Sequence, residues 1–232
     1  MSIERLLFFL GILILIIFLA YRFRKIIKLI AIRIAYGNYS YEYLNSYKRY
    51  FIKSPFQYCF RDDLVAHILY VLFKKEDVPT YKSHKDIYFE NTPFFINYKD
   101  FLKERGKPYC FNAFYIGQLE FEIKALGYQS MVAGSKAIIV FYFMNDVFFM
   151  GEYIFKNPKT NLKASIVDHF LEIREMKADN FYIENTKNRI VHFLNTGFTI
   201  DIKYLNKEDQ VIINNLKEYY NFITGKKLNV DS

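Results

Sequence analysis

Two residues far apart in the chain have side chains suited to covalent chemistry, Cys110 and His169. Cys110 precedes a segment with helical spacing, and a helix N-terminus lowers the pKa of a thiol. A histidine beside it in the fold would accept the thiol proton, which makes a thiol hydrolase or transferase one hypothesis. However, the helical spacing also puts His169 on one face with three apolar residues, as in a hydrogen-bonded core histidine: Leu162, Ile166 and Ile173. A buried, non-catalytic role for both residues is favoured.

The cysteine pattern predicts no redox or metal chemistry. The chain contains two cysteines, Cys59 and Cys110, and neither lies in a Cys-x-x-Cys motif or at a metal-ligand spacing from histidine. We expect both to be reduced, buried and inert, as in a cytosolic domain. No catalytic, cofactor-binding or metal-binding residue is therefore assigned, and no cofactor is expected.

Other short motifs are equally uninformative. No P-loop, dinucleotide-binding, H-E-x-x-H, EF-hand or zinc-ribbon spacing occurs. The letters of Ala133–Lys136 resemble a phosphate loop, but this segment lies between two predicted strands. Glu122–Lys124 has the letters of a metal-nuclease triplet, yet its apolar neighbours place it on a helix as a solvated pair. His84 and His192 belong to no metal pattern.

The N-terminal segment predicts a membrane anchor. From Leu6 to Tyr21, sixteen residues carry no charge and include no proline. A helix of that length covers about 24 Å, enough to cross a thin bilayer with little tilt. Aromatic and basic residues follow at 21–25, and no small-x-small cleavage site is present. A retained anchor is therefore favoured over the alternative, a cleaved signal peptide.

The charge distribution predicts the orientation of the anchor. Six of the 32 basic and one of the 24 acidic residues lie within 1–36, so that segment carries +5 of the formal +8. Most of these charges follow the apolar segment, which predicts a C-terminal domain in the cytoplasm of a single-pass plasma or inner membrane protein. The remaining +3 is too small to indicate nucleic-acid binding.

The pattern downstream predicts an α+β domain with a largely antiparallel sheet. We divide the chain into an anchor with a basic juxtamembrane helix (1–36), a tyrosine-rich helical linker (37–60), a cytosolic α+β domain (61–225) and a tail (226–232). The expected order is helix, three strands, helix, three strands, helix. These elements are placed at 112–126, then 128–134, 136–144 and 147–155, then 161–176, then 180–184, 188–194 and 197–205, and last at 206–225.

Several finer expectations belong to this scheme. Residues 61–77 read as an amphipathic helix, and 86–98 as two strands around a turn. Residues 137–155 are apolar enough to imitate a second membrane span, but Asn145-Asp146 near the middle favours a hairpin. In the last strand, Phe198, Ile200, Ile202 and Tyr204 are expected to be buried while Thr199, Asp201 and Lys203 face water.

The combination favours a membrane-anchored, non-enzymatic protein-binding module: a tether, an adaptor or an assembly subunit. Exposed sheet-forming segments would accept a partner strand. The alternative is the membrane-anchored thiol hydrolase or transferase that uses Cys110 and His169. The expected partners are the lipid bilayer and another protein, without nucleic acid, and oligomer formation stays open.

Overall fold

The structure, a computed structural model, describes residues 3–57, 59, 68–69, 71–73, 78–117, 119–156, 162–170 and 178–224. The chain divides into two compact units, Met1–Pro55 and Phe56–Ser232. Most of the predicted helix at 61–77, the end of the last helix at Gly225 and the tail at 226–232 lie outside the described residues. Within 61–77, the described apolar positions Ile68, Leu69, Val71 and Leu72 are helical and buried.

The first unit consists of two helices, α1 (Ile3–Tyr36) and α2 (Tyr41–Phe51). Gly37 follows α1 with a φ of +89°, a conformation that glycine adopts without strain. Ser40 caps α2, because its Oγ accepts a hydrogen bond of 3.2 Å from the backbone N–H of Tyr43. Measured over the described residues, none of the helices combines the length and the apolar content that crossing a membrane requires.

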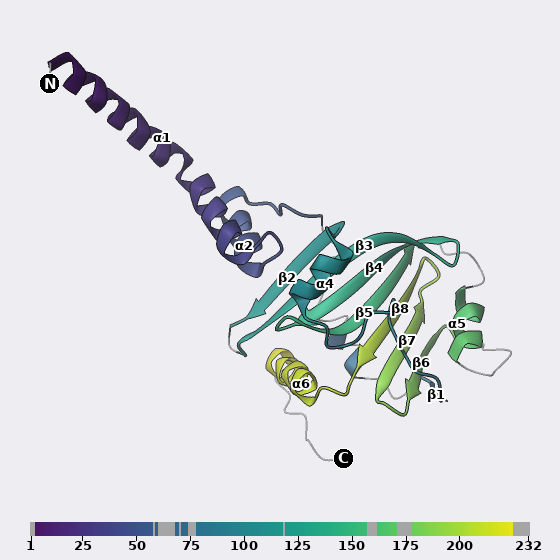
Figure 1. Cartoon of the computed structure of the whole chain (residues 1–232). Coiled ribbons are helices and arrows are strands. Elements are labelled where there is room, and N and C mark those ends of the chain that lie inside the picture. Colours follow the sequence, from purple (N-terminus) through teal and green to yellow (C-terminus); the bar gives the residue numbers. More distant parts are fainter. Residues whose placement is uncertain are drawn as a thin grey trace. The chain divides into compact units, whose positions relative to one another are not determined.

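The second unit is mixed α+β and is built on one eight-stranded sheet (Figure 1). Among the described strands, β1 and β6 pair in parallel and all other neighbours are antiparallel. In spatial order the strands are β1 (Thr80–Ser83), β6 (Asn180–Asn185), β7 (Arg189–Asn195), β8 (Thr199–Asn206), β5 (Val147–Lys156), β4 (Ser135–Met144), β3 (Phe121–Val132) and β2 (Cys110–Ile116). The helices are α4 (Tyr98–Arg105), α5 (Leu162–Phe170) and α6 (Gln210–Thr224).

The hairpin between β4 and β5 is confirmed. Asn145 and Asp146 have φ values of +47° and +67°, and two successive positive φ values are what a tight two-residue hairpin turn requires. Lys124 on β3 holds this turn, since its Nζ lies 2.7 Å from Oδ1 of Asp146. The apolar stretch at 137–155 is therefore two paired strands.

The predicted helix at 112–126 is wrong, because these residues form most of β2 and the start of β3. Ile123 and Leu126 point to opposite faces of β3, yet both are fully buried. Since both faces of the sheet are covered, the apolar positions lose the alternation that marks a half-exposed strand and imitate a helical spacing. The order in this half is therefore α4, four strands, α5, three strands, α6.

The two predicted strands at 86–98 are also absent. Within this described segment the pairing is limited to isolated bridges, from Phe89 to Thr92 and from Asn97 to Val147. The segment instead lays aromatic side chains on the sheet: the Phe89 ring centroid is 5.0 Å from that of Phe141 and 5.2 Å from that of Tyr204.

Helices and loops cover both faces of the sheet. Side chains on one side, called the polar face, include Tyr142, Glu152, Lys203 and His192. Apolar residues of α6 pack on this face together with Ile68, Leu69, Val71 and Leu72. The opposite side, called the aromatic face, carries Phe141, Tyr153, Phe193 and Tyr204, and α4 packs there through Phe101.

The expected solvent-facing side of β8 is exposed only in part, since Thr199 and Asp201 are half-buried. Ile200, Ile202 and Tyr204 are buried as predicted, but Lys203 is only 1% exposed. Phe198, which was expected in the core, precedes the strand and is 85% exposed. At Lys203, the alternation along β8 therefore separates two covered faces rather than a core from solvent.

Gly151 on β5 makes room for the Phe89 ring. A Cβ at this position would lie 2.1 Å from the ring, so Gly151→Ala is expected to displace Phe89 and lower the free energy of unfolding by about 2 kcal/mol. Chemical denaturation of the full chain measures this value. Gly117→Ala is the control, because its new Cβ would meet nothing closer than 3.6 Å. Equal stability of the two variants would contradict the packing described for Phe89.

Candidate functional site

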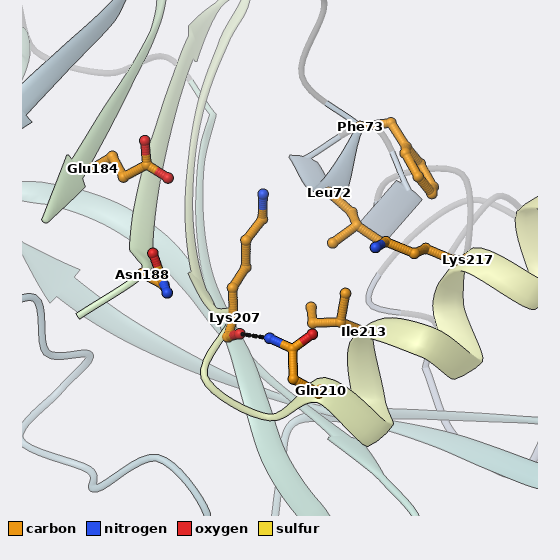
Figure 2. Close-up of a pocket in the computed structure, with 8 residues that line it drawn as sticks. All are labelled: Leu72, Phe73, Glu184, Asn188, Lys207, Gln210, Ile213 and Lys217. Atoms are coloured by element: carbon orange, nitrogen blue, oxygen red, sulfur yellow. Dashed lines mark hydrogen bonds between the residues drawn. The ribbon is translucent and has the colours of Figure 1, made fainter. Parts of the chain in front are cut away.

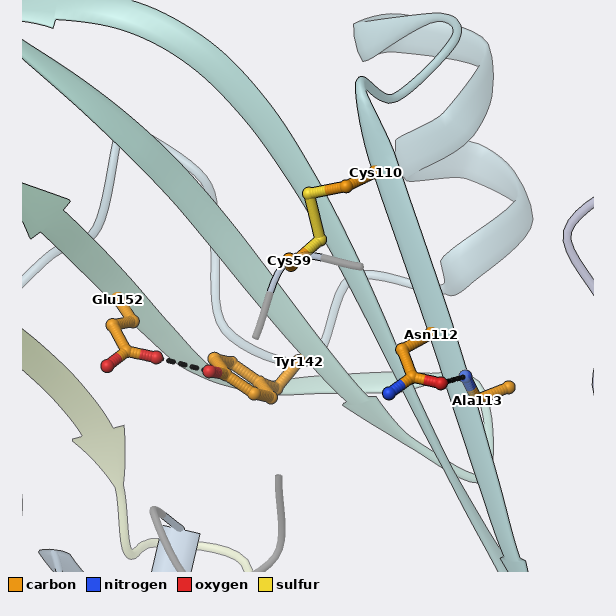
Figure 3. Close-up of a disulfide and its surroundings, with 6 residues drawn as sticks. All are labelled: Cys59, Cys110, Asn112, Ala113, Tyr142 and Glu152. Atoms are coloured by element: carbon orange, nitrogen blue, oxygen red, sulfur yellow. Dashed lines mark hydrogen bonds between the residues drawn. A yellow bond between two sulfur atoms is a disulfide. The ribbon is translucent and has the colours of Figure 1, made fainter. Parts of the chain in front are cut away.

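Cys110 and Cys59 form a disulfide, so the expectation that both are reduced is wrong (Figure 3). Cys110 does not precede a helix but begins β2, and the Cα atoms of the two cysteines are 5.3 Å apart. A Cβ on Gly127 would lie 2.3 Å from Sγ of Cys110 and 2.7 Å from Sγ of Cys59. The sequence therefore leaves a space for the bridge on the neighbouring strand.

The disulfide fastens the start of the second unit to the sheet. Gln57 makes a parallel bridge with Cys110, and its carbonyl accepts a hydrogen bond of 3.3 Å from the backbone N–H of Phe111. The ring of Phe56 meets that of Phe111 edge-on at 5.3 Å. The covalent bond thus acts together with backbone pairing and aromatic packing at the edge strand β2.

His169 lies on α5 and is not brought to Cys110. Successive cross-strand partners lead from Cys110 through Gly127 and Val140 to Glu152, which places Cys110 on the polar face. His169 lines a groove on the aromatic face, above β5 and β8. Three inter-strand spacings, about 14 Å, and the thickness of the sheet separate the two residues. The thiol-enzyme hypothesis thus lacks both the thiol and the required proximity.

The groove beneath α5 is the best candidate for a binding site. It has a volume of about 420 Å³, within the usual range for ligand sites. Its floor is apolar and aromatic, and its rim carries the polar side chains of Ser165, Asp168 and His169. The floor residues are Tyr153 and Phe155 from β5, Ile202 and Tyr204 from β8, and Ile166 from α5.

The two phenols of the floor are held in place. Oη of Tyr153 donates a hydrogen bond of 2.6 Å to Oε1 of Glu90, and Arg105 lies 3.6 Å from the other oxygen of that carboxylate. Burial, followed by the contact with Glu90, raises the pKa of Tyr153, and burial likewise raises the pKa of Tyr204. Both phenols are therefore neutral at physiological pH, and the hydrogen bond to Glu90 holds the Tyr153 ring in place.

A buried row of polar side chains crosses the other face of the sheet. Oη of Tyr142 donates a hydrogen bond to Oε2 of Glu152 (Figure 3). Nζ of Lys203 lies 3.0 Å from Oε1 of the same carboxylate. The side chains of Glu152 and Lys203 are 2% and 1% exposed. Burial and the neighbouring carboxylate raise the pKa of Tyr142 well above its ordinary value. This row is closed to solvent, and its contacts join β4, β5 and β8.

His192 continues the row on β7 as a neutral residue. Its Nε2 lies 2.8 Å from Oδ1 of Asn180, and its ring stacks on Tyr182 with centroids 4.5 Å apart. Burial, with a smaller effect of the Lys203 charge, lowers the pKa of His192 to about 3. The folded protein therefore keeps this imidazole unprotonated far below the ordinary histidine pKa of about 6.5.

This shift predicts a loss of stability in acid. Between pH 6.5 and pH 3 the unfolded chain binds a proton that folded His192 does not, so stability falls as the pH is lowered. From pH 7 to pH 5 this contribution is about 2 kcal/mol. Denaturation curves at the two pH values test it, with His192→Gln as the variant that lacks the titrating group. A variant that loses as much stability as the natural chain would contradict the assignment.

A second pocket, of about 310 Å³, lies between α6, the β6–β7 turn and residues 72–73. Figure 2 shows the ammonium groups of Lys207 and Lys217 extending into it opposite Glu184 and Asn188. Nζ of Lys82 lies 2.9 Å from Oε2 of Glu184. Charges of both signs in and beside this pocket give it no clear preference for one ligand class.

The short motifs of the sequence have structural roles. Glu122 and Lys124 lie on β3 and not on a helix, and Nζ of Lys124 is 2.9 Å from Oε2 of Glu122. The side chain of Lys124 is 10% exposed, so this pair is largely buried rather than solvated. Ala133 and Gly134 form the turn between β3 and β4, with φ values of +47° and +73°, as expected for a segment between strands. In the described part of the chain, no three His, Cys, Asp or Glu side chains gather as metal ligands would.

The chain matches no known protein family, no curated protein and no solved structure.

Sequence reasoning named His169 but missed the aromatic floor beside it. Tyr153 and Tyr204 come from strands that are distant in sequence and adjacent in the sheet. The one signal was the alternation in β8, which assigned Tyr204 correctly to a covered face. Nothing in the spacing indicated that α5 would lie over β5 and β8.

Proposed function

We propose that this chain is a membrane-tethered, non-enzymatic binding protein whose second unit faces an oxidising compartment. The Cys59–Cys110 disulfide carries this proposal. It occupies the thiol that the enzymatic alternative needs, and structural disulfides form and persist outside the reducing cytosol. The groove beneath α5 provides the surface for binding.

The side chains of α1 support the membrane tether. The apolar residues from Phe8 to Leu19 are exposed along the helix, with Phe8 67% and Ile17 60% exposed. Each such side chain gains about 1.5 to 3 kcal/mol when it leaves water, so an uncovered run of this length favours insertion into lipid. Beyond the run, the guanidinium of Arg24 lies 4.9 Å from the ring centroid of Tyr21, a pairing suited to the membrane interface.

Two features of the chain point to opposite sides of the membrane for the second unit: the basic residues after the apolar run and the disulfide. The basic residues after the apolar run favour a cytoplasmic second unit, but long domains cross membranes largely regardless of their charge. A disulfide requires an oxidant, which the cytosol of most cells does not maintain. We therefore place the second unit outside the cytosol, opposite to the orientation that the basic flank predicts.

Two measurements on the full chain in cells test this proposal. A reporter enzyme that is active only outside the cytosol, fused to the C-terminus, is expected to be active, and the fusion is expected to stay in the membrane pellet after an alkaline wash. Ile17→Arg should release the chain from the pellet, whereas Ile34→Arg, on the same helix beyond the apolar run, should not. An inactive reporter on the full-length fusion, or a chain in the soluble fraction, would overturn the proposal.

A further inference from the structure

We propose that the groove beneath α5 binds the arginine side chain of a partner polypeptide. This inference rests on the proposed binding function and names the chemistry that the groove selects. It follows from three properties of the groove: its shape, its fixed aromatic floor and the charge on its rim.

The shape fits one long side chain that enters from solvent. The floor residues Phe155 and Ile202 are almost completely buried, whereas Ser165, Asp168 and His169 on the rim are exposed. Sites for free small ligands enclose most of the ligand surface. A groove that is open along one rim suits a group that remains attached to a larger molecule.

The aromatic side chains of the floor form a surface on which a planar cation can stack. The rings of Tyr153 and Tyr204 meet edge-on with centroids 5.8 Å apart, and Phe155 lies 6.0 Å from Tyr153. Hydrogen bonding to Glu90 fixes one of these rings. Lys163 fastens α5 above the floor, since its Nζ lies 3.0 Å from Oδ1 of Asp179. Because these contacts already restrict the Tyr153 ring and α5, binding loses less conformational entropy there, which favours affinity.

The charge on the rim selects a cation. Asp168 is the one carboxylate among the described residues that line the groove, and none of these residues is Lys or Arg. No described residue makes an ion pair or a hydrogen bond with Asp168. Two other pockets formed by described residues differ: Lys207 and Lys217 line the one beside α6, and Lys136 lines another at β3 and β4. Of these three pockets, the groove beneath α5 is the best suited to a positive charge.

Guanidinium satisfies both features at once. It stacks on aromatic faces, and it donates paired hydrogen bonds to a carboxylate. The ammonium group of lysine is a compact, strongly hydrated charge, and it does not stack on an aromatic ring as a planar guanidinium does. Arginine is also among the residues that most often dominate the energy of protein interfaces.

The test uses the full chain in detergent micelles and two short peptides, one with a central arginine and one with citrulline, its uncharged isostere. Titration calorimetry or ligand-observed NMR is expected to show at least fivefold tighter binding of the arginine peptide. Free arginine should bind more weakly than the peptide, because it lacks the attached chain. Equal binding of the two peptides would overturn the proposal. Absence of binding of either peptide at a concentration of about 10 mM would also overturn it.

Matched variants locate the binding. Asp168→Asn is expected to reduce the preference for arginine at least threefold, whereas Asp100→Asn, an exposed acid on α4, should leave it unchanged. Thermal melting checks that both variants are folded. If Asp168→Asn leaves the preference intact, the groove is not the site. A failed binding test would overturn the arginine proposal and not the proposed membrane tether or compartment. An inactive C-terminal reporter would overturn the proposed compartment and not the arginine proposal.

Discussion

Reduction of the Cys59–Cys110 bond is expected to lower the free energy of unfolding by about 4 kcal/mol. The bond joins residues separated by 51 positions, and closing a loop of that length removes roughly this much conformational entropy from the unfolded chain. The expected loss is a large fraction of the total stability of an ordinary domain. Backbone pairing of Gln57 and the Phe56 ring would still contact β2.

Denaturation of the full chain with and without a reductant measures this loss. The chain has 21 tyrosines and no tryptophan, so near-ultraviolet circular dichroism of the tyrosines reports on the packed core. The double variant Cys59→Ala, Cys110→Ala serves as the control, because it should be destabilised to a similar extent and should not respond to the reductant. A change of less than 1 kcal/mol in the natural chain would contradict the structural role assigned to the bond.

Removal of one partner from the buried Glu152–Lys203 pair is expected to have a similarly large effect. Lys203→Met leaves the Glu152 carboxylate enclosed by the core without its cation, at a cost of about 4 kcal/mol. Tyr142 still donates to this carboxylate, but one hydrogen bond from an uncharged hydroxyl does not replace the lysine cation.

A double-mutant cycle separates the pair from its surroundings. Glu152→Gln combined with Lys203→Met removes both charges and keeps an acceptor for Tyr142, so the double variant should be more stable than Lys203→Met alone. Free energies of unfolding for the four proteins give the coupling. Losses that simply add would show that the two side chains do not interact across β5 and β8.

Local turn chemistry made part of the fold predictable. The Asn145-Asp146 pair identified the β4–β5 hairpin. The last helix was placed from residue 206, but α6 begins at Gln210 and Asp209 caps it: Oδ1 of Asp209 accepts from the backbone N–H of Val211 at 2.9 Å. Turn and cap interactions join residues only a few positions apart, so they can be recognised from the sequence without knowledge of the tertiary structure.

Long-range pairing made the rest unpredictable. Lys203 looked like a solvent-facing residue because its partner, Glu152, is on a different strand that the sequence does not align with it. The helix expected at 112–126 failed for a related reason, since both faces of β3 are covered by segments remote in sequence. The bond between Cys59 and Cys110 and the groove beneath α5 likewise depend on the order of the strands, which no motif specified.

The state of the two cysteines in living cells tests the account most directly. Cells expressing the full chain are quenched in acid, and free thiols are labelled with a maleimide that carries a large polymer, before and after reduction. We predict no labelled chain before reduction and two polymers per chain afterwards. Two polymers per chain without reduction would contradict both the bond and the compartment assigned to the second unit.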